Sequence, residues 1–300
     1  MTTSDPGSVL DRPAPAAGGH DAEGSRPRRP WYRRPRRVVA LVALLALALG
    51  GVLFARSWSE RGAEEASTED AIQRYREQEG AGDGASGFLR PAAGVYEYEA
   101  SGTERLSLLE TTQRWGPTMP ATVRHEPDGC WVLRIEYSTN HWQELTACPT
   151  ETELLEDGGR TFQSFDFVAF TVGDTNVFTC EPRGVMIRID AQPGDRWSQS
   201  CDGRSEQRGT KVTSAGPNTF LGVEELDIGG TTVGALHYRS ERTLSGDQTG
   251  GETTHSWYSV TDGMLLRSTH DVRVASPSPI GDVVYTERGE FQLTSRTPQR

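Results

Sequence analysis

The chain has 300 residues, a net charge of −11 and 24% charged residues. Eight arginines stand against four acids in residues 1–37, so the acidic excess lies entirely in the remainder. An acidic body disfavours nucleic acid as a partner, and the absence of G-x-S-x-G, H-E-x-x-H, Walker and Rossmann motifs gives no sign of an enzyme.

The N-terminal part predicts a membrane anchor. Residues 1–37 are rich in Pro, Gly, Ala and Arg, and we expect a disordered basic segment in the cytoplasm. Residues 38–55 carry no charge and would reach about 27 Å as a helix, close to the thickness of a bilayer core. The arginines before them hold that end inside, which predicts a single-pass cell-membrane protein with an extracytoplasmic C-terminal domain. The alternative is a cleaved signal peptide, which would also export that domain.

Residues 56–91 are predicted to form a charged stalk with one short helix. The helix is expected over residues 67–78, with Ser67 at the N-cap and Asp70 three positions later. Ile72 and Tyr75 are its only large apolar residues.

Residues 92–300 are predicted to form one mainly β domain. Short segments rich in Val, Thr, Tyr, Phe and Trp alternate with Gly, Asp, Asn and Pro. We expect a curved antiparallel sheet, as a half-barrel or open barrel, with the N-terminal helix beside it.

The first hairpin has a three-residue loop, Ser138–Asn140, in which Asn140 is expected to be left-handed. In this register the numbers of two directly opposed residues add up to 278, so Arg134 faces Glu144. The opposite face is apolar and holds Trp131, Leu133, Ile135, Tyr137, Leu145 and Ala147.

All four cysteines, Cys130, Cys148, Cys180 and Cys201, lie in the exported part, which predicts two disulfides. Three pairings are possible. The hairpin register places Cys130 opposite Cys148, and Cys180 and Cys201 flank a looser pair of segments, 185–190 and 195–201. Sequence order therefore favours Cys130–Cys148 and Cys180–Cys201.

A second hairpin is predicted over residues 253–274, with Gly263 as the left-handed turn residue. In its register the numbers of two directly opposed residues add up to 524. Tyr258 then faces Leu266, and Val260 faces Met264. The preceding strand, 231–243, is expected to join through a glycine-rich loop, 245–251, so that three strands form a meander.

The histidines give no catalytic or metal motif. In this register His255 and His270 point to opposite faces, and only a one-residue slip would place them together around a metal. His270 and Asp271 are adjacent on a strand, so their side chains diverge. His141 and His237 are expected to be half-buried strand residues. We therefore expect no catalytic residues, no metal and no cofactor.

Aromatic residues offer a further binding hypothesis. Four tryptophans lie on separate strands, where packing is their ordinary role, and Trp142 lies on the face away from Trp131. An exposed Trp142 would favour an aromatic surface for a lipid or glycan. The segment 276–286 is either a binding loop or, as its Ser-Pro-Ser-Pro sequence favours, a rigid connection between two strands.

The last eighty residues resemble lipoprotein-carrier-like envelope proteins. The segments that carry the resemblance are Phe220–Glu224, Leu226–Val233 and Trp257–Arg267, in which an aromatic strand meets an Asp-Gly turn. The chain also resembles uncharacterised membrane-anchored proteins of high-GC bacteria. The resemblance implies an open half-barrel that holds acyl chains, although this chain lacks a lipid-attachment cysteine and adds two disulfides.

Three functions are left to distinguish. The first is a membrane-anchored domain that binds an apolar or envelope-derived ligand, with a lipid, glycan or envelope protein as partner. The second is a structural or assembly component of an envelope complex, which predicts a filled interior with no cavity of about 300 Å³ or more. The third is a hydrolase, which predicts an acid–base pair converging in a cleft.

Overall fold

The computed structural model describes residues 45–51, 64–78, 84–107, 111–166, 171–279 and 281–300. The chain divides into two compact units, Met1–Gly51 and Val52–Arg300. In the first unit residues 45–51 are helical; segment 1–37 and the rest of the predicted anchor 38–55 lie outside the described residues. No helix among the described residues has the length and apolar character needed to cross a bilayer.

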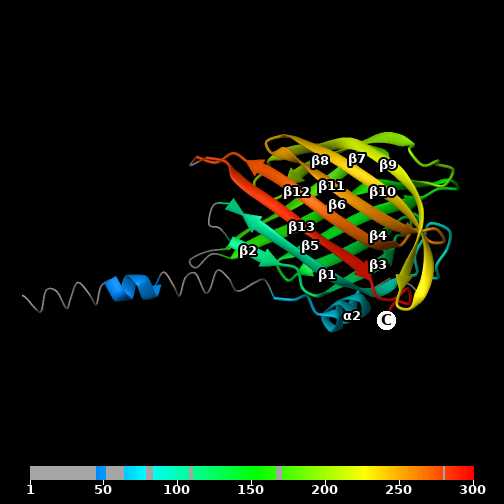
Figure 1. Cartoon of the computed structure of the whole chain (residues 1–300), viewed down its shortest axis with the longest axis horizontal. Helices are drawn as coiled ribbons and strands as arrows, with labels where there is room; N and C mark the ends of the chain where they lie inside the picture. Colours follow the sequence, from blue (N-terminus) through cyan, green and yellow to red (C-terminus); the bar gives the residue numbers. More distant parts are fainter. Residues whose placement is uncertain (1–44, 52–63, 79–83, 108–110, 167–170, 280) are drawn as a thin grey trace, which may run out of the picture. The chain divides into compact units, whose positions relative to one another are not determined.

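The second unit is an antiparallel β-barrel with one α-helix among its described residues (Figure 1). Its elements in chain order are α2 Thr68–Glu77, β1 Gly94–Leu106, β2 Thr111–Arg114, β3 Thr118–His125, β4 Trp131–Ser138, β5 His141–Pro149, β6 Glu153–Asp166, β7 Thr171–Arg188, β8 Arg196–Ser205, β9 Lys211–Ile228, β10 Thr231–Gly246, β11 Thr249–Ser259, β12 Leu265–Ser276 and β13 Val283–Leu293. Strands that follow one another in sequence pair with one another from β3 to β13, and β1 pairs with β3 while the short β2 lies beside β1.

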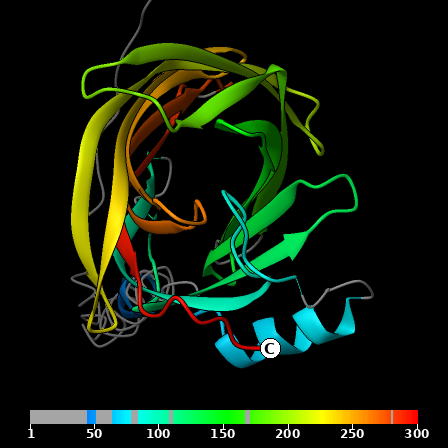
Figure 2. The ribbon, with the colours of Figure 1, turned by 90° about the vertical axis from the view of Figure 1, so that its right-hand side faces the viewer.

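The barrel is closed by its first and last long strands. β1 pairs with β13 in unbroken register from Tyr98 opposite Leu293 to Leu106 opposite Tyr285. The sheet is therefore a closed barrel of 12 strands, and the prediction of a half-barrel is wrong. Figure 2 shows the strands as a ring with α2 outside it. Sequence patterns reveal hairpins between neighbouring segments, whereas this closure joins segments from opposite ends of the domain.

The first hairpin has the predicted register over most of its length. Trp131 lies opposite Ala147 and Arg134 opposite Glu144. The register shifts after Glu136, and only Thr139 and Asn140 form the turn. The prediction of a left-handed Asn140 is wrong, since Leu89, with φ of 51°, is the sole non-glycine with positive φ in the described part of the chain. A β-bulge absorbs the extra residue instead.

The second hairpin also has its predicted register as far as Trp257, which lies opposite Arg267. A bulge then places Tyr258 opposite Leu265, so the predicted pairing of Tyr258 with Leu266 is wrong. Val260 lies beyond the end of β11. Gly263 has the expected positive φ of 70°.

The three-strand meander of β10, β11 and β12 is confirmed, but its predicted glycine-rich loop is not. β10 extends to Gly246 and β11 begins at Thr249, which leaves a two-residue turn. Gly246 has a φ of 110°, which lets the chain reverse within so few residues.

The structure contains the disulfides Cys130–Cys148 and Cys180–Cys201, the pairing that sequence order favours. The third predicted pair of segments is different from expectation. β7 and β8 pair only where Asn176–Thr179 meets Asp202–Ser205. Beyond the Cys180–Cys201 bridge the two strands are joined by side chains, because Trp197 Nε1 donates to the Val185 carbonyl oxygen at 2.7 Å. We call this stretch, formed by residues 183–188 of β7 and 196–201 of β8, the β7–β8 seam.

The helix α2 packs on the outside of the barrel. Ser67 is its N-cap, as predicted, and Ser67 Oγ accepts a hydrogen bond from the Asp70 amide at 3.2 Å. Ala71 and Tyr75 are buried against Val95 of β1. Leu89, in the same predicted stalk, is fully buried in the core of the barrel.

Candidate functional site

The barrel interior changes from apolar to polar along its axis. The inward pairs of β1 and β13 show the change: Ala100 opposite Phe291, then Gly102 opposite Gly289, then Glu104 opposite Glu287. The apolar end is filled by side chains that include Leu89, Tyr98, Met119, Trp131, Leu133, Leu154, Ile187, Met264, Leu266, Phe291 and Leu293.

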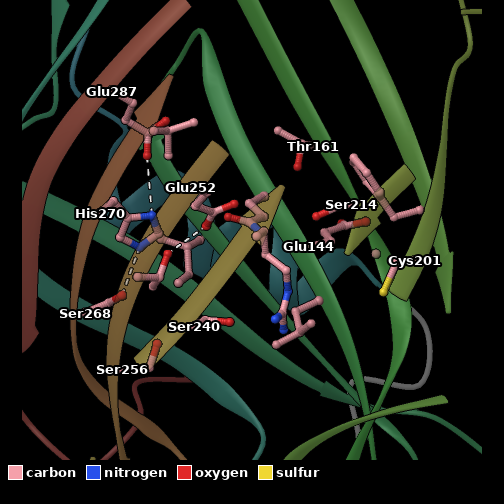
Figure 3. Close-up of a pocket in the computed structure, with 18 of the residues that line it drawn as sticks. Glu144, Thr161, Cys201, Ser214, Ser240, Glu252, Ser256, Ser268, His270 and Glu287 are labelled. Atoms are coloured by element: carbon pink, nitrogen blue, oxygen red, sulfur yellow. Dashed lines mark hydrogen bonds and ion pairs between the residues drawn. The ribbon is translucent and has the colours of Figure 1, made fainter. Parts of the chain in front are cut away.

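The polar end encloses a cavity of about 410 Å³. Hydroxyl, amide, carboxyl and imidazole groups enter it from most of the strands, and Figure 3 shows how several of them converge. The polar lining residues include His141, Gln143, Glu156, Thr161, Gln163, Asn176, Gln199, Ser214, Asn218, Ser240, Arg242, Glu252, Thr254, Ser256, Ser268, His270, Tyr285 and Glu287. Apolar side chains line the rest of the cavity, among them Leu133, Ile135, Leu145, Phe178, Met186, Val272 and Val274. The interior is therefore hollow at this end.

Glu104 and His141 form a buried ion pair beside the cavity. Glu104 Oε1 lies 2.5 Å from His141 Nδ1 and also accepts from Trp115 Nε1 at 2.8 Å, while Gln163 donates to Oε2 at 2.7 Å. Burial alone would raise the pKa of Glu104, but the charge of His141 and these hydrogen bonds outweigh it and lower the pKa. Burial likewise opposes the charge on His141, but Glu104 raises the pKa of His141 above its ordinary value. The pair is thus held in its charged form.

Glu287 and His270 form a second acid–imidazole pair. Glu287 Oε1 lies 3.4 Å from His270 Nδ1, and Tyr285 donates to Glu287 Oε2 at 2.5 Å. Burial, with the nearby charge of Glu104, raises the pKa of Glu287 to about 7. Burial also lowers the pKa of His270. Both groups therefore tend toward their neutral forms, in contrast to the first pair.

Arg242 anchors a third polar group on the other side of the cavity. Its guanidinium donates to Gln199 Oε1 and Asn218 Oδ1, both at 2.9 Å, and to the carbonyl of Gly216. Gln199 in turn donates to Glu156, whose pKa is raised by burial. These contacts hold the guanidinium at the wall of the cavity.

Glu252 lies between the two sides. It is directly opposite Arg242 in the β10–β11 ladder, yet the guanidinium is engaged by Gln199 and Asn218. Thr254 donates to Glu252 Oε1 at 2.7 Å. The charge of Glu252 acts on both Arg242 and His270. A carboxylate thus faces the cavity at its centre (Figure 3).

One cluster among the described interior residues places three potential metal-ligand atoms close together. One donor atom from each of Glu104, His141 and Glu287 lies within 4.8 Å of the others, and all three residues are buried. A second group, Glu156 with Cys180 and Cys201, offers no thiolate because the two cysteines are disulfide-bonded.

The histidines singled out by the sequence are separated as the register predicted. His255 is on the outside of the barrel with His237, whose Nε2 lies 2.9 Å from His255 Nδ1. His270 enters the cavity, and the neighbouring Asp271 points outward, where it pairs with Arg288 at 2.5 Å. His141 is buried and His237 nearly so, deeper than the half-burial expected.

Trp142 lies on the exterior of the barrel, as expected from its register. The Arg134 guanidinium carbon lies 3.9 Å from its ring centroid, and Phe162 stacks on the ring at 5.8 Å. An arginine therefore covers the exterior tryptophan. The segment after β12 connects it to β13, which begins at Val283.

Sequence reasoning missed the converging interior groups. Glu104, His141 and Glu287 come from β1, β5 and β13. The closure of β1 on β13 places the two glutamates opposite each other, and His141 reaches them across the barrel interior. The sequence did contain one sign of the two buried acids, because every second residue of a strand lies on the same face. Glu104 shares its face with Tyr98, and Glu287 shares its face with Phe291 and Leu293. A glutamate in an otherwise apolar row points to a buried acid.

The fold and the interior define the protein as a disulfide-bonded 12-stranded barrel with an interior cavity of mixed polar and apolar lining. No family model and no curated protein matches the chain. Two solved structures are similar. YmcC of Escherichia coli, described as a hypothetical lipoprotein, has 13% identity and a TM-score of 0.30, over 75% of this chain and 97% of YmcC. A proposed lipoprotein of Parabacteroides distasonis has 10% identity and a TM-score of 0.33, over 70% of this chain and 99% of its own. At these values the likeness carries no argument about function.

Proposed function

We propose that the barrel is an extracytoplasmic binding domain for a small hydroxylated ligand, of the kind that one or two sugar units of an envelope glycan provide. The observation that carries the proposal is the hollow end of the barrel, about 410 Å³ in volume, where hydroxyl, amide and charged side chains converge among apolar ones. Ligand sites in proteins are commonly cavities of ~300–1,000 Å³ with a few convergent polar groups.

The lining favours a polar ligand over the acyl chain that the resemblance implied. An acyl chain would exclude water from the charged groups of Glu252 and Arg242 and offer no hydrogen bond to replace it, which is costly even though Thr254, Gln199 and Asn218 satisfy part of their hydrogen bonding. A polyhydroxylated ligand would hydrogen-bond to both. A purely structural role leaves the cavity unexplained, since a scaffold gains stability from a filled interior.

The cellular setting in the proposal is supported by the two disulfides and by the predicted anchor 38–55. Disulfides persist in oxidising compartments and are rare in the cytosol. The membrane is accordingly the proposed attachment, and no nucleic acid is expected.

Native mass spectrometry of the full chain in mild detergent tests the proposal. We expect a hydrophilic adduct, either co-purified or restored by adding a disaccharide fragment of envelope glycan. Glu252→Gln and Arg242→Met should each weaken binding about tenfold or more, because each removes a charged hydrogen-bond partner. Arg239→Met is the matched control, since Arg239 lies on the same strand but pairs with Glu241 outside. Bound acyl lipid, or weakening by the control alone, would contradict the proposal.

A hydrolase is the second candidate, favoured by one arrangement. Ser268 Oγ lies 2.9 Å from His270 Nε2, and His270 Nδ1 faces Glu287 (Figure 3). This order of groups is that of a nucleophile, base and acid. Ser268 Oγ, however, donates to the backbone carbonyl of His255 at 3.2 Å, which leaves its proton turned away from the imidazole. Labelling of Ser268 by a fluorophosphonate, lost in Ser268→Ala, would establish this candidate in place of the binding domain.

A further inference from the structure

We propose that Glu104, His141 and Glu287 bind a divalent transition-metal ion inside the barrel, with His270 as an adjoining fourth ligand. The donor atoms of the first three converge within 4.8 Å of one another. The proposal concerns a different set of groups from the Arg242–Glu252 side of the cavity, and it stands or fails separately from the proposed ligand.

The first argument is the juxtaposition of two carboxylates. Glu104 and Glu287 are directly opposite each other on β1 and β13, on the inward face, and are 1% and 7% exposed. Like charges in such a pair repel, and the barrel interior screens them poorly. His141 balances the charge of one of the two acids only. A divalent cation between the two carboxylates would displace the protons on Glu287 and His141, so that both acids bind it ionised and His141 binds it as a neutral imidazole.

The second argument comes from the orientation of His270. Ser268 Oγ–H donates to the His255 carbonyl, so the same oxygen accepts the proton carried by His270 Nε2, 2.9 Å away. In the neutral ring Nδ1 then carries a lone pair, which is aimed at Glu287 Oε1 at 3.4 Å. Two acceptor atoms face each other across a gap that a cation or a shared proton would occupy.

The third argument is that each acid ligand is already oriented by a neighbour. Trp115 and Gln163 donate to Glu104, and Tyr285 donates to Glu287. Outer-shell hydrogen bonds of this kind fix ligand orientation in metal sites and tune affinity. Imidazole together with carboxylate suits Zn²⁺, Mn²⁺ or Fe²⁺, whereas Ca²⁺ and Mg²⁺ prefer all-oxygen sites.

Zinc titration of the chelator-stripped full chain tests the proposal, with metal content measured after dialysis. We expect one interior equivalent per chain. Glu287→Gln and His141→Gln should weaken zinc binding by at least about tenfold, since each removes a ligand. His255→Gln is the matched control, because the exterior His237–His255 pair is the competing imidazole site. The interior equivalent should survive this change.

The contrary outcomes are distinct. If the stripped chain takes up no zinc, the two acids share a proton and the proposal is wrong. If His255→Gln abolishes binding while Glu287→Gln leaves it unchanged, the metal sits on the exterior pair and the proposal is equally wrong. If Glu287→Gln or His141→Gln fails to fold, the Tyr285→Phe variant provides the test. This variant keeps all the proposed ligands but loses the hydrogen bond to Glu287. An unchanged zinc affinity in Tyr285→Phe would overturn the proposed site. Co²⁺ in place of Zn²⁺ gives a visible spectrum that should change in the same variants.

Discussion

Single residues in this barrel are governed by which face of the sheet they occupy. His270 and Asp271 are neighbours in sequence, yet one lines the cavity and the other pairs with Arg288 on the exterior. The period of two that separates them was predictable from sequence. The chemical environment of His270 was not, because Glu287 reaches it from another strand.

The exterior histidine pair predicts a pH dependence of stability. Burial, with the nearby His237 and Arg239, lowers the pKa of His255 below its ordinary value of 6.5. The unfolded chain therefore takes up the proton first, and stability is lost as the pH falls below that value. Denaturant unfolding at about pH 7 and about pH 5 should show a smaller loss for His255→Gln than for the wild type. An equal loss in both would contradict the assignment.

A glycine pair predicts a site of tight packing. Gly102 and Gly289 lie opposite each other, and the Trp115 ring rests against both; a Cβ on Gly289 would come 2.5 Å from that ring and 2.7 Å from Gly102 Cα. We expect Gly289→Ala to cost ~1–3 kcal/mol, because the closing strands or the ring must shift. The change should be seen in denaturant unfolding and tryptophan fluorescence.

Gly87→Ala is the control for that measurement. A Cβ on Gly87 meets nothing closer than 3.9 Å. Its effect should stay within about 0.5 kcal/mol. Similar losses in both variants would show that packing against Trp115 is not the cause.

At the scale of elements, local pairing was predictable and long-range pairing was not. The hairpin around Thr139 and Asn140 and the meander of β10–β12 follow from alternation and turn residues. Bulges after Glu136 and Trp257 escaped prediction, since a one-residue irregularity leaves the alternating pattern on both sides intact. The β7–β8 seam escaped it too, because a strand-like pattern does not say whether a neighbour is hydrogen-bonded.

The two disulfides should therefore contribute differently to local stability. Cys130–Cys148 joins strands that are already paired along β4 and β5, whereas Cys180–Cys201 lies at the end of a ladder of only four residue pairs. Each loop closure is worth ~3 kcal/mol in the entropic model. Cys180→Ala with Cys201→Ala should in addition speed amide exchange in residues 183–188 and 196–201. The other double variant should leave those segments protected.

At the scale of the whole molecule, the class of fold was predictable and its closure was not. Composition and strand spacing indicate a β domain of one core. Whether such a sheet is open or closed depends on the pairing of β1 with β13, and neither strand carries a local mark of its partner. The candidate site depends on that same pairing, so it was hidden together with the closure.

The proposed topology makes a prediction for the intact cell. If the domain is exported, all four cysteines should resist alkylation until a reductant is added, and a C-terminal tag should be cleaved by protease applied from outside. Free thiols, or a protected tag in cells whose outer layers are permeable, would contradict an extracytoplasmic location. Denaturing mass spectrometry after alkylation gives the thiol count.

The pairing of β1 with β13 also determines when the barrel can close during synthesis of the chain. The ribosome synthesises β1 long before β13. Until Val283–Leu293 has emerged, one edge of β1 has no strand to pair with. A pairing between segments so far apart in the chain forms late, and the unpaired strand edges are exposed to other chains until it forms. A stop codon a few dozen residues early would remove β13 and leave an open sheet. Glu104 and His141 would then lack Glu287, and the interior site would not form.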